Sequence, residues 1–261
     1  MFKGIFSSQH WEKIEESVPL ECVNGERMSA NNGKRFFELI KKREQLEGTK
    51  IIGMLLHLAT SQYTVNRNYQ ELSKAVAWYE GDLSIWDVKN RRQLDAFIRE
   101  FHRLSHNYLS STYSLIGHTR TFCEELSNLK LNEEYSCKVA ELRSHGCVRF
   151  VYDLRRYSQH INLPIALATL SFTQTVPKSG NGKIEQRLLL KKEELMKWKD
   201  WHRVSRKHIE SQKEVDLKPV FAEYQALMKD FYEWLYRRVG ELYQRELEEF
   251  VKIERELSQL N

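Results

Sequence analysis

The sequence has few of the residues that interrupt helices or cross-link a chain. It contains 4 prolines and 11 glycines among 261 residues, and this composition favours long helices over short strands and tight turns. No Cys-x-x-Cys pair occurs, although such short paired spacings are typical of zinc sites. We therefore predict a helical protein with no metal and no other cofactor, in which these cysteines are reduced thiols: Cys22, Cys123, Cys137 and Cys147.

Long apolar segments are also missing. The residues after Met1 become polar by Ser7, so no run typical of a signal peptide follows. The most apolar stretch, "IIGMLLHLA" from Ile51, is much shorter than the roughly 20 residues of a membrane-spanning helix. We therefore expect a cytoplasmic protein that makes no use of a membrane.

Neither sign of charge is in large excess. Lys and Arg number 41 against 36 Asp and Glu, which gives a net charge of +5. This mildly basic balance is compatible with an anionic partner but does not predict one. Basic residues outnumber acidic ones between residues 187 and 213, where we favour a solvated helix face over a phosphate-binding face.

Apolar periodicity predicts most of the secondary structure. After Arg91, large apolar residues recur every seven positions, which is typical of a helix that packs along one face and indicates a continuous helix to about Leu126. After a polar connection, a second strong pattern predicts a helix over residues 139–161, ended by Pro164 because the residue before a proline leaves the α region. Weaker patterns predict helices over residues 34–46, 51–63, 68–80, 192–214 and from 217 towards 257.

Between residues 165 and 190 the pattern changes to partial alternation. It predicts strands over 166–175 and 184–190, joined by "SGNGK", which lacks the spacing of a phosphate-binding loop. The predicted fold is all-α, an antiparallel bundle of long helices with an inserted β-hairpin around residues 165–190. Residues 1–85 are expected to form a helical extension packed on the bundle, and residues 86–261 one compact domain.

Other motifs give little chemical signal. His102 and His106 are four positions apart, a spacing that suits a shared metal, but no third ligand follows in phase. We interpret His106 as a hydrogen-bonded polar group at a helix interface. No Gly-x-Ser-x-Gly motif supplies a nucleophile, and the aromatic residues after Tyr224 are predicted to pack in the core rather than stack on bases.

The stretch "DLRRYSQHINLP" from Asp153 carries the main hypothesis. Metal-free cleavage of RNA needs a base for the 2′-hydroxyl proton, an acid for the leaving oxygen and a cation for the charged phosphorane, and His and Arg suit these roles. Arg155, Arg156 and His160 lie in this stretch. The spacing from Arg155 to His160 occurs again from Arg203 to His208, so spacing alone does not separate a catalytic site from a surface stripe.

Three runs together resemble the HEPN superfamily, in particular its stand-alone bacterial branch. They are "RRQLDAFIREFHRLSHNYLSSTYSLIGHTR", "FVYDLRRYSQHINLP" and "LKPVFAEYQALMKDFYEWL", and the resemblance covers Trp86 to Leu235. It implies a homodimeric helical bundle, often a metal-independent endoribonuclease of toxin–antitoxin or anti-phage systems, with RNA as substrate and a separate antitoxin as a further partner. The resemblance implies that Arg155 and His160 are the catalytic pair, with supporting residues Asp153, Tyr157, His106 and Asn107.

Two features depart from this pattern. The family usually has a small polar residue, most often Asn, where this chain has Arg156. In an ideal helix, moreover, Arg155 and His160 point about 140° apart, whereas Asp153, Arg156 and His160 share one stripe. A distorted helix end before Pro164, or a pocket completed by the partner subunit, would resolve this difference.

The leading hypothesis is therefore a homodimeric endoribonuclease. In it, His160 is the general acid or base, Arg155 the phosphate clamp and Arg156 an auxiliary cation, while Asp153 orients an imidazole or engages Arg156. The alternative is a non-catalytic HEPN-like module that binds nucleic acid, a nucleotide or a protein, and Arg156 is the feature that favours it.

Overall fold

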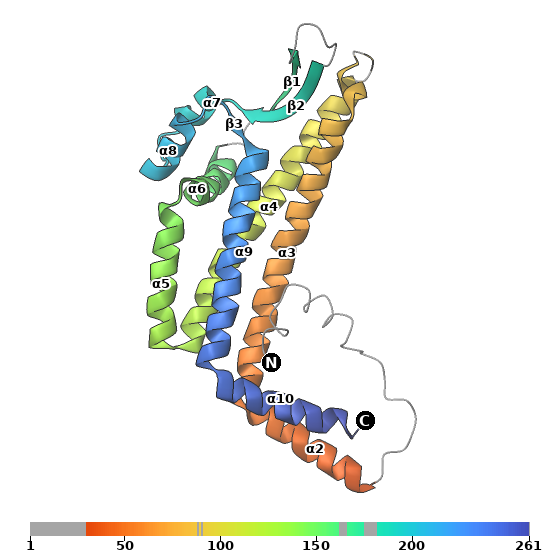
Figure 1. The fold of residues 1–261 in the computed structure, drawn as a ribbon, viewed down its shortest axis with the longest axis vertical. Helices are drawn as coiled ribbons and strands as arrows, with labels where there is room; N and C mark the ends of the chain where they lie inside the picture. Colours follow the sequence, from red (N-terminus) through yellow and green to blue (C-terminus); the bar gives the residue numbers. More distant parts are fainter. Residues whose placement is uncertain (1–29, 88, 90, 162–165, 175–181, 261) are drawn as a thin grey trace. The chain divides into compact units, whose positions relative to one another are not determined.

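The structure is a computed structural model that describes residues 30–87, 89, 91–161, 166–174 and 182–260. These residues form an all-α helical bundle with a small inserted sheet, as predicted (Figure 1). Among the described helices, none combines the length and apolar character needed to cross a bilayer. The helices are α2 (Ala30–Gln45), α3 (Glu47–Gly81), the 3-10 helix η2 (Leu83–Trp86), α4 (Arg91–Leu126), α5 (Leu129–Ser144), α6 (Gly146–His160), α7 (Lys192–Lys197), α8 (Arg203–Glu210), α9 (Leu217–Leu242) and α10 (Gln244–Ser258).

Contacts divide the described residues into two compact units. The first unit contains those of Met1–Ala59, Phe122–Tyr135 and Lys229–Asn261, and the second those of Thr60–Thr121 and Ser136–Met228. The long helices α3, α4, α5 and α9 each contribute residues to both. The expected boundary at residue 85, between a helical extension and one compact domain, stays a prediction.

In the first unit, α2 packs beside α10 (Figure 1). Leu39, Ile253 and Leu257 form their buried contact. An ion pair between Arg43 and Glu254 (3.1 Å) flanks it. Gly48 of α3 also belongs to this unit, and the α10 backbone lies where a Cβ at this position would be, so that only glycine permits this approach of the two helices.

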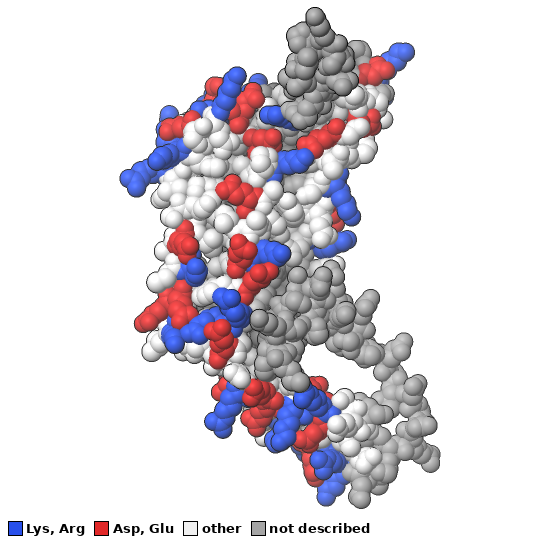
Figure 2. Space-filling view, viewed as in Figure 1, with Lys and Arg blue, Asp and Glu red and all other residues white. Residues whose placement is uncertain are grey.

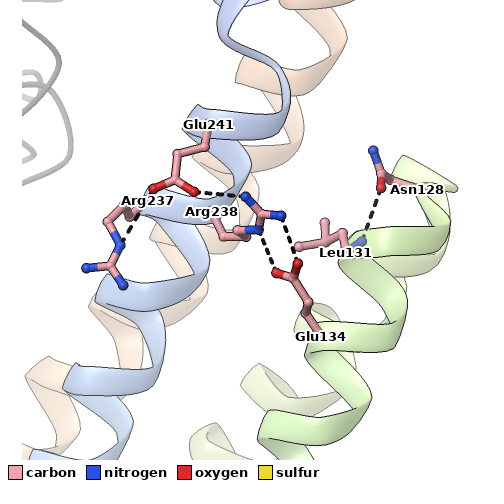
Figure 3. A network of polar contacts seen from close by, with 6 residues as sticks. All are labelled: Asn128, Leu131, Glu134, Arg237, Arg238 and Glu241. Atoms are coloured by element: carbon pink, nitrogen blue, oxygen red, sulfur yellow. Dashed lines mark hydrogen bonds and ion pairs between the residues drawn. The ribbon is translucent and has the colours of Figure 1, made fainter.

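A bidentate ion pair joins α5 and α9 within the first unit (Figure 3). Arg238 donates to both carboxylate oxygens of Glu134 at 2.5 and 2.7 Å and to Glu241 at 2.9 Å. Close by, Asn128 accepts a hydrogen bond from the backbone N–H of Leu131 at 3.1 Å. This asparagine cap explains why α5 begins at Leu129, inside the segment predicted to be a polar connection.

Helix α4, most of which lies in the second unit, follows the prediction from Arg91 to Leu126. The stripe of apolar residues at seven-residue spacing is buried from Phe101 onward. Tyr108 at its centre packs edge-on against Phe221 of α9, with ring centroids 5.0 Å apart. The Tyr108 hydroxyl donates to Gln225, which in turn donates to Asn66 of α3. Packing against α3 and α9 fixes α4, and Tyr113 of α4 contacts Arg155 of α6.

Four predicted helix boundaries are wrong. The helices expected over 51–63 and 68–80 are one continuous helix, α3, because no glycine or proline interrupts the residues between them and Val65 continues the buried face. The helix expected over 139–161 is divided at His145, whose backbone is extended and precedes Gly146, a poor helix former. The segments 192–214 and 217–257 are each two helices as well, separated at residues 198–202 and at Tyr243.

The predicted hairpin is confirmed. Strands β1 (Ala166–Gln174) and β2 (Gly182–Leu190) pair antiparallel, with Ala166 opposite Leu190. A short third strand, β3 (Val215–Asp216), pairs with the end of β2 and was not predicted. The "SGNGK" turn lies mostly outside the described residues. The hairpin therefore connects α6 to α7 and α8 along the chain. Helix α8 packs against α6.

Candidate functional site

Helix α6 carries the main predicted residues and is regular from Gly146 to His160. Phe150, Leu154 and Tyr157 are buried and fix the rotation of the helix. Because the helix is undistorted up to His160, about 100° per residue still separates Arg155 and His160 by about 140°. The distorted helix end that would have brought Arg155 and His160 together is therefore not seen within α6. The residues between His160 and Pro164 lie mostly outside the described part.

Asp153 is fully buried and connects α6 to the start of α8. Its Oδ2 accepts hydrogen bonds from the backbone N–H of His202 at 3.0 Å and from the hydroxyl of Ser205 at 2.7 Å. Its Oδ1 forms ion pairs with Arg149 at 3.2 Å and with Arg156 at 3.8 Å. Of the two predicted roles, the structure supports the contact with Arg156, and no described contact joins Asp153 to His160.

Arg156 is partly engaged by the fold. Its guanidinium lies 5.6 Å from the ring centroid of Trp198, a cation–π geometry. Its ion pair with Asp153 is long, and 39% of the side chain is exposed. Arg156 therefore lies on the α7 side of α6, on the same stripe as His160.

Arg155 faces another side of α6, towards α4. Its guanidinium lies 3.8 Å from the ring centroid of Tyr113. The ring centroids of Tyr113 and Tyr152 are 5.7 Å apart, and the guanidinium carbon of Arg149 lies 5.0 Å from the ring centroid of Tyr152. We call Arg149, Tyr152, Tyr113 and Arg155 the cation–aromatic row, because its two tyrosines lie between two arginines.

Among the described residues, none uses the hydrogen-bond donors of the Arg155 side chain. The Arg155 side chain forms no hydrogen bond or ion pair with another described residue, and its Nε is buried. Tyr113, beneath it, is 37% exposed. A guanidinium that lies over an aromatic ring, with donors that no described residue uses, is suited to contact a phosphate, since arginine donates two parallel hydrogen bonds to this group.

His160 is the last residue of α6 and is exposed. It makes no hydrogen bond or ion pair with any other described residue. Exposure and an unused ring allow His160 to exchange protons with a bound molecule.

Tyr157, predicted as a supporting residue, belongs to a buried aromatic cluster. Its ring stacks on Trp201 at 5.6 Å and meets Trp198 edge-on at the same distance. Burial raises the pKa of its hydroxyl above the usual value, with a further contribution from Glu194. The hydroxyl therefore stays protonated, and Tyr157 supports the site by packing.

The other two supporting residues lie elsewhere on α4. His106 is exposed, and the backbone carbonyl of Asn107 accepts a hydrogen bond from Asn68 of α3 at 3.4 Å. The interpretation of His106 as a hydrogen-bonded group is wrong within the described part of the chain, where it has no such partner. Across that part, no three His, Cys, Asp or Glu side chains gather as metal ligands, so the pair His102 and His106 gains no support as a metal site.

The described cysteines are unpaired thiols, as predicted. Burial raises the pKa of both Cys123 and Cys147 to about 12, and Cys137 is exposed. Cys22 lies outside the described residues. The two buried thiols are therefore not nucleophiles at neutral pH.

Sequence reasoning missed three members of the cation–aromatic row: Arg149, Tyr152 and Tyr113. A local signal existed for the first two, because Arg149 stands four positions before Asp153 and three before Tyr152, spacings that bring side chains together on a helix. Tyr113 comes from α4, and only the packing of α4 against α6 brings it to Arg155.

Comparison of the chain with protein-family models, with curated proteins and with solved structures finds no match. The resemblance to the HEPN superfamily therefore stays a prediction. The geometry of α6 and its neighbours is the main support for a function of this chain.

Proposed function

We propose that this chain is a metal-independent endoribonuclease that acts as a homodimer on cytoplasmic RNA. The observation that carries the proposal is the position of Arg155, a cation over the Tyr113 ring with no ion-pair partner among the described residues, on the helix that ends in the exposed His160. The cation is suited to a scissile phosphate and the imidazole to proton transfer. A toxin–antitoxin or anti-phage role, with a separate antitoxin protein, is the biological setting that we propose on the resemblance alone.

The reaction needs no cofactor. The RNA 2′-oxygen attacks the adjacent phosphorus while a base removes its proton, and the bond from phosphorus to the 5′-oxygen breaks as an acid protonates that oxygen. The products are a 2′,3′-cyclic phosphate and a 5′-hydroxyl. One imidazole supplies one of these proton transfers at a time, so a His160 from each of two chains would supply both.

A second chain would also account for the different directions in which Arg155 and His160 project from α6. Arg155 and His160 point about 140° apart, so a single chain does not direct both at one phosphate. A two-fold axis beside α6 would bring Arg155 of one copy near His160 of the other. A monomeric mass by light scattering at micromolar concentration would contradict this arrangement.

The test is cleavage of total RNA by the purified protein in EDTA. We expect cleavage by the wild type, none by His160→Ala, and a loss of about 10²–10³-fold for Arg155→Ala, as for removal of one transition-state donor. Arg99→Gln is the matched control, since Arg99 is an exposed arginine of α4 without a described partner. Equal activity of all variants would exclude the proposed site.

A non-catalytic RNA-binding module is the second candidate. The observation that favours it is that the cation–aromatic row is complete without His160, and such rows suit stacked bases and their phosphates. This candidate predicts that RNA binds the wild type uncut and that Tyr113→Ala weakens binding while His160→Ala does not. Cleavage in EDTA that His160→Ala abolishes would exclude it.

A further inference from the structure

The Arg155 side chain is enclosed near its middle and open at its end. Its Nε is buried and has no hydrogen-bond partner, whereas its two terminal nitrogens, which also lack a partner among the described residues, are not buried. A guanidinium is planar, so burial of one edge directs the other edge outwards. The terminal N–H donors of Arg155 therefore face solvent.

The Tyr113 ring lies under this guanidinium, within the second unit. The distance of 3.8 Å from the guanidinium carbon to the ring centroid is typical of a cation–π contact. A buried N–H donor without an acceptor destabilises the conformation that buries it. The attraction of the cation to the ring face offsets this cost. Without the ring, the side chain would be free to turn its Nε to water.

The backbone of α4 fixes the position of Tyr113. Thr112 and Leu115 are each only 4% exposed, and their burial sets the rotation of the helix at this point. Tyr113 projects from the surface of α4 and keeps 37% exposure, so it contributes little to the core. Its described ring contacts are those with Arg155 and Tyr152.

The two ends of the cation–aromatic row are held differently. Arg149, Tyr152 and Arg155 are spaced by three positions and therefore follow one ridge of α6. Arg149 is only 19% exposed and pairs with the buried Asp153 at 3.2 Å. Arg155 has no carboxylate partner in the described part of the chain. A carboxylate thus fixes one guanidinium of the row, and the Tyr113 ring fixes the other.

The charge of the surface is mixed. Figure 2 shows Lys and Arg interspersed with Asp and Glu over the face in view, and the net charge of the chain is only +5. Neighbouring fields of opposite sign partly cancel, so such a surface orients a polyanion weakly. The orientation of an individual cation is therefore more important for placing a phosphate than the overall charge.

We propose that Tyr113 is a positioning residue for Arg155, the phosphate clamp. This inference rests on the proposed ribonuclease function, and it adds a residue of α4 to a site that α6 otherwise supplies. An arginine side chain loses rotamer freedom when it binds a phosphate, and a guanidinium that is already oriented loses less. Tyr113 acts on the reaction only through Arg155, by keeping its terminal N–H groups directed outwards.

Steady-state cleavage of RNA in EDTA tests this role. We expect Tyr113→Leu to lower kcat about 3–30-fold, the range that a cation–π contact is worth. KM should not change, because the clamp acts in the transition state. Tyr113→Phe keeps the ring and should cleave like the wild type. In an Arg155→Ala background, Tyr113→Leu should have no further effect. Tyr63→Leu is the matched control, since Tyr63 of α3 is 52% exposed and contacts no cation in the described part of the chain.

A second measurement does not depend on activity. Heteronuclear NMR of the Arg155 Nε–H, assigned by its loss in Arg155→Ala, should show slow hydrogen exchange in the wild type and in Tyr113→Phe, and fast exchange in Tyr113→Leu. Unchanged exchange in Tyr113→Leu would overturn the proposal, as would a kcat equal to that of Tyr63→Leu. A raised KM with an unchanged kcat would also overturn it, because Tyr113 would then bind RNA directly. If the wild type leaves RNA uncut while exchange changes as expected, the ribonuclease proposal fails and the positioning of Arg155 by Tyr113 stands.

Discussion

Replacing Asp153 by alanine removes the buried carboxylate that joins α6 to α8. The fully buried side chain accepts two hydrogen bonds, from His202 N–H and the Ser205 hydroxyl, and faces Arg149, which is itself only 19% exposed. Removing one member of a buried ion pair costs about 3–5 kcal/mol, since the other charge stays buried without a partner. We expect Asp153→Ala to lower the free energy of unfolding by about this amount.

Two further variants separate charge from hydrogen bonding. Asp153→Asn keeps an acceptor for the two donors and loses only the charge, so it should cost less than Asp153→Ala. Ser205→Ala removes one hydrogen bond to a charged group, worth about 1.5–3 kcal/mol. When Asp153→Ala is already present, adding Ser205→Ala should cost no further stability, because the Ser205 hydroxyl has lost its acceptor.

Urea unfolding followed by tryptophan fluorescence measures these differences, because Trp198 and Trp201 pack against Tyr157 one turn from Asp153. A loss below about 1 kcal/mol for Asp153→Ala, against the range above, would refute the role of this carboxylate. Additive effects of Asp153→Ala and Ser205→Ala would refute the hydrogen bond between them.

Three other outcomes are expected from the structure. Gly48→Ala should destabilise the first unit by roughly 1–3 kcal/mol, because a Cβ there meets the α10 backbone; the melting temperature reports it. Iodoacetamide at pH 8, read by peptide mass spectrometry, should modify Cys137 and spare Cys123 and Cys147, whose pKa burial raises to about 12. Burial lowers the pKa of His208 below its ordinary 6.5, so the neutral ring is favoured in the folded state. Stability should be full above pH 6.5 and fall below it, and this slope should be smaller in His208→Gln.

The long amphipathic helix α4 could be predicted closely from the sequence, because its apolar stripe, which is buried from Phe101 to Phe122, repeats over four seven-residue steps without a proline. The helix breaks at His145 and Tyr243 could not be predicted, since each interrupts a pattern that is otherwise typical of one continuous helix. The Tyr243 hydroxyl donates to the carbonyl of Leu126, a tertiary contact that local pattern does not contain. Tertiary packing also explains the interval at residues 198–202, where Trp198 and Trp201 turn inwards.

Only the part of the candidate site that depends on helix periodicity could be predicted. Periodicity placed Asp153, Arg156 and His160 on one stripe, and the observed contacts of Asp153 and Arg156 with the residues around α7 and α8 agree with it. The partners of Arg155 were not predictable, because Tyr113 is more than forty positions away along the chain. The identity of a neighbour from another helix depends on interhelical packing, which one sequence does not specify.

The ion pairs of Asp153 determine which substitutions the chain tolerates around it. Arg149 lies closer to the carboxylate than Arg156 does, at 3.2 Å against 3.8 Å, so its charge neutralises Asp153 when position 156 changes. Arg156→Asn should therefore leave the fold intact, and relatives of this protein are expected to vary at position 156. Position 205 has no such freedom, since it must place a short hydroxyl 2.7 Å from the carboxylate. We expect Asp153 and a serine or threonine at 205 to be inherited together, or to be replaced together by two apolar residues.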